Sequence, residues 1–254
     1  MGSELPALLV AVFALISLVY GSVGLGGGSA YVATMVVLGV DHTVAPVLAL
    51  TLNLVVAGGG FVHFARFGFF RSRLFLPLVV TSVPAAFFAS QIPISRSAFQ
   101  MALAVALLVA GIRMMTSKWV WTEERVLRGQ APIWFLGLLG VTLGAIAGLT
   151  GIGGGIYLAP VLILARLASP KQTAAISAAF IVVNSVAGLA GRIAVGVHPP
   201  WGVLIPLGIT VFIGGQLGAL IGSKRLKPAT VQTIVGVIIL VVSVRILVAS
   251  YAAI

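Results

Sequence analysis

Two glycine-rich runs are the part of this sequence best suited to hold a ligand. The segments Gly24–Ser29 (GLGGGS) and Gly151–Ile156 (GIGGGI) each interrupt a long apolar stretch. Glycine has no side chain and leaves the helical conformation easily, so each run predicts a break in a helix. The arm after each break begins with free N–H groups and the positive end of the helix dipole, which favour a negative charge. Two such ends that face each other would bind an anion without a charged side chain.

Close packing of helices is the alternative explanation of the glycines, because small residues often line helix contacts in membranes. Two runs at matching places of the chain favour the ligand site over packing alone. A nucleotide-binding loop is disfavoured, since no strand pattern precedes the glycines and no Lys-Ser or Lys-Thr pair follows them.

Two asparagines lie at matching positions after the glycine runs. Asn53 and Asn184 fall in the apolar segment that follows each run, and each amide suits either an anion or a bridge between helices. Ser177, two turns before Asn184, and Thr51 are further polar side chains on these segments. The predicted substrate-binding residues are Gly26, Gly27, Gly28, Ser29, Asn53, Gly153, Gly154, Gly155, Ile156, Ser177 and Asn184.

Other kinds of chemistry lack the residues they need. The chain has no cysteine and three dispersed histidines, so neither a metal site nor a cofactor is expected. The four acidic residues, Glu4, Asp41, Glu123 and Glu124, fall in predicted ends or loops. No carboxylate is therefore available for a proton relay or a sodium site deep in a membrane. Because no catalytic constellation lies within the apolar segments, we expect no enzyme.

The sequence leaves the roles of four further polar residues open. His63 suits interfacial packing or proton coupling, and Arg192 suits an entrance for anions or an anchor for topology. Gln100 and Gln232 occupy matching places near the starts of their segments. Their position favours packing or a gate over contact with the substrate.

The composition indicates a membrane protein. Of 254 residues, 60% are hydrophobic and 7% are charged, which is too few charges for the surface of a soluble domain. Long apolar runs without alternation predict an all-α membrane protein rather than a β-barrel. The net charge of +11 comes from basic residues between these runs, which suits lipid headgroups rather than nucleic acid. The apolar segments cover residues 5–40, 43–65, 74–90, 97–115, 133–167, 174–190, 201–222 and 229–251.

The same series of four segments occurs twice, which predicts an internal repeat. The two glycine runs match, Asn53 matches Asn184, and Gln100 matches Gln232, all in the same order along the chain. We expect a first repeat at residues 1–116 and a second at 132–254, joined by a cytoplasmic loop at 117–131.

Length and charge predict how the repeats are inserted. As one straight helix, residues 5–40 would be about 54 Å long, against a hydrocarbon core of about 30 Å. A glycine-broken hairpin fits better, so each repeat would hold one such hairpin and three transmembrane helices. Twelve of the fifteen lysines and arginines then fall on one side and three on the other. The positive-inside rule therefore predicts two inverted repeats in the cytoplasmic membrane, with both termini outside.

A known family shares these features. Residues 148–160 (GLTGIGGGIYLAP), followed by 171–185 (KQTAAISAAFIVVNS), resemble the sulfite exporter TauE/SafE family, also called the toluenesulfonate uptake permeases. The first half is a weaker version of the pattern, with Ala33 in the place of Pro160, so a fully symmetric site is not expected. The resemblance implies a permease for sulfite, sulfonates or related organosulfur anions.

The resemblance leaves more than one mode of transport open. Alternating access around the glycine-broken hairpins is the leading interpretation. An uncoupled anion channel and a carrier for small carboxylates are the alternatives. The expected partners are a small anion and membrane lipids, without nucleic acid, and the sequence gives no oligomeric state.

Cysteine labelling tests the predicted topology directly, because the chain has no cysteine of its own. Single cysteines introduced at Pro93 and Lys224 should react with an impermeant thiol reagent from opposite faces of the membrane. Labelling of both from the same face would refute the inverted arrangement.

Overall fold

The computed structural model describes residues 7–22, 26–116, 131–224, 236–237, 240–244 and 246–248. Within these ranges the regular structure is helical and contains no strand. The helices are α1 (Ala7–Gly21), α2 (Gly28–Val37), α3 (Val44–Arg66), α4 (Ser72–Ala89), α5 (Arg96–Thr116), α6 (Ile133–Thr150), α7 (Gly155–Leu164), α8 (Pro170–Ala194) and α9 (Trp201–Lys224). The predicted connecting loop, apart from Ala131, and most of the last apolar segment, with Gln232 and Arg245, lie outside the described residues.

Five of these helices are long and apolar enough to cross a membrane. They are α3, α4 and α6, together with Lys171–Ala194 of α8 and Trp201–Gly218 of α9. Shorter apolar helical stretches occur at Leu9–Gly21, Gly28–Val37 and Arg96–Ile112. The prediction of an all-α fold is therefore confirmed for the described residues, and five of their helices have the length and composition of membrane spans.

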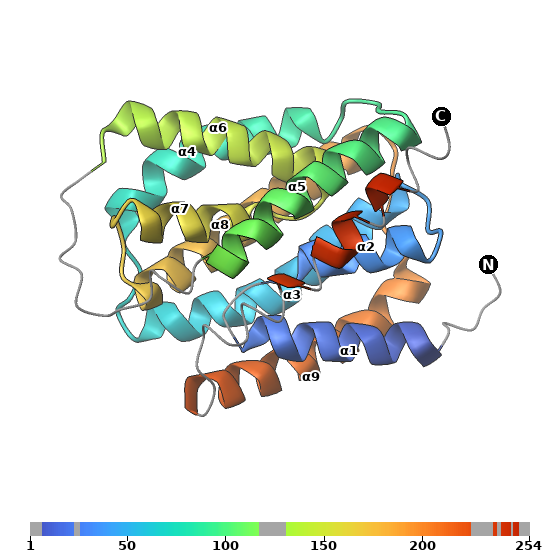
Figure 1. The fold of residues 1–254 in the computed structure, drawn as a ribbon, viewed down its shortest axis with the longest axis horizontal. Coiled ribbons are helices and arrows are strands. Elements are labelled where there is room, and N and C mark those ends of the chain that lie inside the picture. The colour runs from blue at the N-terminus through green and yellow to red at the C-terminus, as the bar shows by residue number, and fades with distance from the viewer. Residues whose placement is uncertain are drawn as a thin grey trace.

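Both glycine-containing stretches are broken into two helices. Helix α1 ends at Gly21 and α2 begins at Gly28, while α6 ends at Thr150 and α7 begins at Gly155. In Figure 1, α2 runs back towards the end of the molecule where α1 begins, and α7 does the same relative to α6. Each second arm has ten residues, about 15 Å of helix, or roughly half of the hydrocarbon core. The two breaks therefore lie well inside the helical bundle.

The helix contacts follow a regular pattern. Helix α3 packs against α8, α4 packs against α6 and α8, and α9 packs against α1 and α3. When α1–α4 are set beside α6–α9 in chain order, each of these contacts has its counterpart in the other half. Corresponding helices also run in opposite directions along the long axis in Figure 1.

Glycines bring the backbones of α6 and α4 into direct contact. Gly140, Gly144 and Gly148 follow one another at intervals of four residues on one face of α6. A Cβ atom on Gly144 would lie 2.7 Å from the Cα atom of Ser82 on α4. Small residues at such spacing allow close helix contacts in membranes, where apolar side chains gain little from leaving lipid. This contact fixes the first arm of the second hairpin against α4.

Substitution of Gly144 tests this packing. Gly144→Ala should lower the free energy of unfolding by about 1–3 kcal/mol, the usual cost of overpacking. Gly137→Ala is the matched control on the same helix, because its new Cβ would meet only Thr81 Cγ2, at 3.7 Å. Thermal unfolding of the two variants in detergent measures the difference. Equal stability of both would show that α6 and α4 do not pack this closely.

Candidate functional site

Helices α2 and α7 begin in the same unusual way. Their N-cap residues, Gly27 and Gly154, have φ values of 82° and 77°, in the left-handed region that favours glycine. No side chain caps either helix. Among the described residues, no loop carbonyl accepts from the N–H groups of Ser29 or Ile156 in the first turns. Each helix therefore presents uncapped N–H groups at its positive end.

Some carbonyl groups on the other side of each break accept hydrogen bonds from side chains. At the end of α1, the Ser22 hydroxyl donates to the carbonyl oxygen of Val19 at 2.6 Å. At the end of α6, Arg192 Nη2 donates to the carbonyl oxygens of Gly148 and Leu149, each at 3.0 Å. Before each break, a side chain thus donates to carbonyl groups of the preceding helix, and after each break the following helix begins with uncapped N–H groups.

The two breaks meet at a small cavity of about 10 Å³. The first half contributes the glycine run and two residues with hydroxyl groups to its wall, and the second half contributes three isoleucines. The lining residues are Tyr20, Gly26, Gly27, Gly28 and Ser29, with Ile152, Ile156 and Ile181. A Cβ atom on Gly28 would lie only 2.7 Å from the carbonyl oxygen of Ile152, so the two backbones touch. A cavity of this size holds about one water molecule.

Asn53 links the two halves at this point. Its side chain is fully buried in α3, and its Nδ2 donates to the carbonyl oxygen of Ile152 at 3.1 Å. Its Oδ1 has no partner among the described residues and lies 2.7 Å from the position of a Cβ atom on Gly26. Because an amide nitrogen carries two hydrogens, Asn53 keeps one donor beyond the bond to Ile152.

Asn184 makes a different bond. Its Nδ2 donates at 2.9 Å to the carbonyl oxygen of Phe180, within its own helix. The residues of α8 that lie against Gly154 and Gly155 are instead Ser177, Phe180 and Ile181; the carbonyl oxygen of Ser177 would be 2.8 Å from a Cβ atom on Gly155. Ser185 Oγ would be 3.3 Å from a Cβ atom on Gly153. The hydroxyl groups of Ser177 and Ser185 are buried and unpartnered within the described structure.

Sequence reasoning missed Tyr20, Ile181 and Ser185. The spacing of α8 contained part of the signal, because Ser177, Ile181 and Ser185 are four residues apart and so share one helix face. Asn184, two turns after Ser177, lies close to the same face, but its amide donates within its own helix. Tyr20 had no such signal, since only the fold brings its hydroxyl within 3.1 Å of Ser29 Oγ.

The walls of the cavity differ in polarity. The hydroxyl groups of Tyr20 and Ser29 share a hydrogen bond on the side of the first half. The second half contributes Ile152, Ile156 and Ile181. Ser29 and Ile156 occupy the same place in the two glycine motifs, so the difference in polarity follows from the sequence of the motifs.

The remaining polar residues do not reach this cavity. Arg192 is 9% exposed and holds the end of α6. His63 lies in the last turn of α3, with its ring centroid 5.2 Å from that of Phe67. Gln100 is half-buried in the first turn of α5. No group of three metal-binding side chains occurs within the described ranges.

The bond of Asn53 to Ile152 should contribute measurably to stability. Asn53→Leu would leave the buried Ile152 carbonyl without its donor, which costs about 1–3 kcal/mol. Asn184→Leu is the matched control, because Asn184 is equally buried but donates within its own helix. We expect a clearly lower midpoint of thermal unfolding in detergent for Asn53→Leu. If the midpoint of unfolding fell by the same amount in both variants, the bond between Asn53 and Ile152 would make no particular contribution to stability.

A family model and one known protein match this chain over nearly its whole length, and a second protein matches part of it. A sequence model of the family described as sulfite exporter TauE/SafE matches residues 9–246. A probable membrane transporter protein, y4hK of Sinorhizobium fredii, is 31% identical over 252 residues, covering 97% of this chain and 100% of that protein. A second, YunE of Bacillus subtilis, is 29% identical over 105 residues, or 41% of this chain and 38% of that protein. No solved structure matches the chain significantly.

Proposed function

This chain belongs to the sulfite exporter TauE/SafE family of membrane transporters, and we propose that it moves a small anion, such as sulfite or a sulfonate, across the cytoplasmic membrane. The observation that carries the proposal is the difference between the two sides of each helix break. Ser22 and Arg192 donate to carbonyl groups of α1 and α6, whereas the N–H ends of α2 and α7 are uncapped. Gly28 and Ser29 of α2 and Ile156 of α7 line one buried cavity, while Gly153, Gly154 and Gly155 do not. A ligand that fills this place must accept hydrogen bonds, as the oxygens of an anion do.

The electrostatics of the site favour the same ligand. The two helix N-termini each place a partial positive charge at the cavity, and low-dielectric surroundings strengthen their attraction for an anion. Asn53 and the hydroxyl groups of Ser177 and Ser185 supply further donors nearby. The site needs no lysine or arginine, so an anion can be held without the strong binding that would prevent its release.

Coupling to a cation has little support in the described helices. None of them contains an aspartate or glutamate. Asp41 lies in the loop before α3, where its side chain is 60% exposed. The hydroxyl and the backbone N–H of Thr43 donate to this carboxyl and hold its pKa below the usual range. Asp41 therefore stays charged at neutral pH and does not serve as a proton carrier.

We further propose that transport proceeds by alternating access between two inverted repeats. The matching contacts of α1–α4 and α6–α9, and their opposite directions in Figure 1, support this arrangement. The small volume between the two breaks, about 10 Å³, leaves no continuous pore at this point, which favours a carrier over an open channel. Rocking of one repeat against the other would open the site to each side in turn.

The distribution of basic residues supports an orientation with both termini outside. Arg66 lies where α3 ends, Arg71 precedes α4, and Lys171 lies where α8 begins, and Figure 1 shows these places at one end of the molecule. Arg96, at the start of α5, lies at the other end. By the positive-inside rule, the first end faces the cytoplasm.

A glycine substitution at the cavity tests the site. In Gly28→Ala the new Cβ would lie 2.7 Å from the carbonyl oxygen of Ile152 and 2.9 Å from Asn53 Oδ1. We expect uptake of radiolabelled sulfite into proteoliposomes to fall at least about tenfold, equivalent to about 1.4 kcal/mol. Gly58→Ala is the control, because it lies within α3 and its Cβ would meet nothing within 4 Å.

The same assay separates the modes of transport. Saturation at low sulfite concentration and counterflow would identify a carrier, and linear flux would identify the uncoupled channel. Competition by thiosulfate, sulfonates and short carboxylates defines the accepted anions. Full uptake by Gly28→Ala, with the variant folded as judged by size-exclusion chromatography, would contradict the proposed site.

A further inference from the structure

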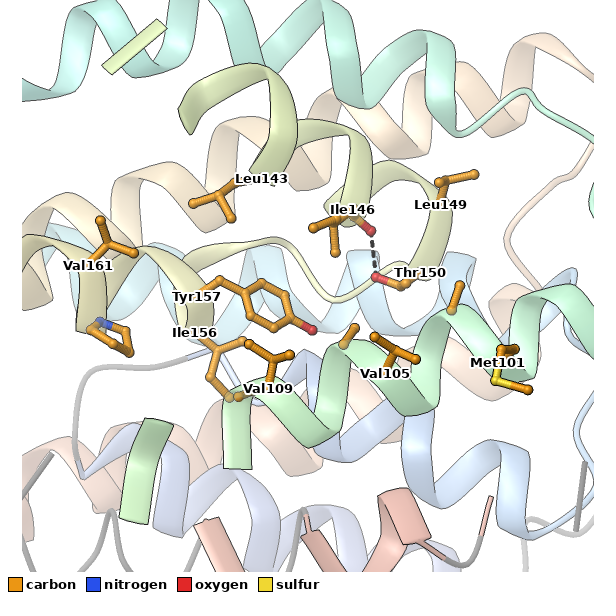
Figure 2. Close-up of a pocket in the computed structure, with 14 residues that line it drawn as sticks. Met101, Val105, Val109, Leu143, Ile146, Leu149, Thr150, Ile156, Tyr157 and Val161 are labelled. Atoms are coloured by element: carbon orange, nitrogen blue, oxygen red, sulfur yellow. Dashed lines mark hydrogen bonds between the residues drawn. The ribbon is translucent and has the colours of Figure 1, made fainter. Parts of the chain in front are cut away.

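A second, larger cavity lies beside the proposed anion site. It has a volume of about 530 Å³ and lies between α5, α6 and α7 (Figure 2). Its walls are almost entirely hydrocarbon, including Val105 and Val109 of α5 and Leu143 of α6. The hydroxyl of Thr150 is not free to bind a ligand as a donor, because it donates to the carbonyl oxygen of Ile146 at 2.6 Å.

Ile156 belongs to the walls of both cavities. It lies in the first turn of α7, directly after Gly155, and is 5% exposed. Figure 2 shows its side chain on the wall of the large cavity, together with Val109 from the facing helix. The counterpart of Ile156 in the first half is Ser29, which bonds to Tyr20 and lines the small cavity but not the large one. The small cavity thus has a polar side and an apolar side, and Ile156 of the apolar side separates it from the larger apolar cavity.

We propose that Ile156 determines specificity by limiting the size of the apolar group that a transported anion can carry. The inference rests on the proposed function, because it assumes that the anion binds at the N-termini of α2 and α7. When the charged group of the anion is bound there, the rest of the anion contacts either the hydroxyl groups of Tyr20 and Ser29 or the side chain of Ile156. An apolar substituent is directed to Ile156, and the large cavity lies behind it.

The chemistry of the large cavity supports an apolar occupant. A cavity lined by hydrocarbon stays dry, and filling it with an apolar group lowers the free energy. Tyr157 has an unpartnered hydroxyl within the described structure, but it is one polar atom in a wall of aliphatic side chains. We assign the space to the apolar part of the anion because the cavity shares Ile156 with the anion site. A lipid acyl chain is the competing occupant, since Val105 and Val109, which line the cavity, are half exposed.

Competition by a series of linear alkanesulfonates tests the proposal. Uptake of radiolabelled sulfite into proteoliposomes is measured with methane-, propane-, butane- and hexanesulfonate as inhibitors. In the wild type, the inhibition constant should not improve beyond the shortest chain. In Ile156→Ala it should fall up to about fourfold for each added methylene group, as expected for burial of hydrocarbon. Ile156→Val should give a smaller gain and serves if the alanine variant does not fold.

Two further variants make the test specific. Ile163→Ala removes the same amount of side chain from a buried position on α7 that lines neither cavity, so its profile should match the wild type. Val109→Phe, combined with Ile156→Ala, refills the large cavity and should abolish the gain. The thermal stability of every variant is measured in parallel.

The outcomes separate this inference from the proposed function. If the wild type takes up sulfite but its inhibition constants depend on chain length in the same way as those of Ile156→Ala, the inference is overturned and the proposed function is not. The same flat profiles are expected if a lipid acyl chain occupies the large cavity. A steep gain with chain length already in the wild type would also overturn it, because Ile156 would then set no limit. Absence of anion uptake by the wild type would overturn the proposed function, and this inference with it.

Discussion

A polar backbone group in the middle of a membrane needs a partner, because lipid offers none. Each unsatisfied N–H or C=O group there costs several kcal/mol. Every break in a membrane helix therefore exposes polar groups on its two sides that need partners. In this protein the breaks before Gly28 and Gly155 are alike: side chains donate to carbonyl groups of the preceding helix, while the N–H groups of the following helix remain uncapped beside a shared cavity.

The surrounding packing keeps these two ends in place. Gly144 brings α6 against Ser82 of α4, and Arg192 of α8 holds the last carbonyls of α6. Asn53 of α3 bonds to Ile152 in the opposite break. Helices α4, α3 and α8 are long and apolar enough to span a membrane, so the short arms are fixed by the spanning helices. A site made of main-chain groups can be positioned accurately only in such a frame.

Much of the fold could be predicted from the sequence because it depends on local properties. The number of apolar segments follows from hydropathy, and the helix breaks follow from a stretch that is too long for one crossing and is interrupted by glycines. The location of the breaks was predicted within the glycine runs, and both lie there. The close approach of the two runs was inferred only from the repeat, and the structure brings them to one cavity.

The details of the site depend on which helix faces meet, which the repeat does not determine. Matching positions suggested matching roles for Asn53 and Asn184, but their hydrogen bonds differ because only Asn53 reaches the opposite loop. Ile181 and Ser185 lie against the glycines instead. The sequence left Arg192 as an entrance for anions or an anchor for topology, whereas the structure buries it against the end of α6, a contact between helices far apart in the chain. Such long-range contacts leave no local pattern.

The most direct test of the account is to locate a bound anion. A crystal grown with selenite, an analogue of sulfite that contains a strong anomalous scatterer, would show its position without ambiguity. The account predicts an anomalous peak within hydrogen-bond distance of the main-chain N–H groups at the starts of α2 and α7. A peak beside Arg192 or at the basic end of the molecule, with the cavity between the glycine runs empty, would contradict it.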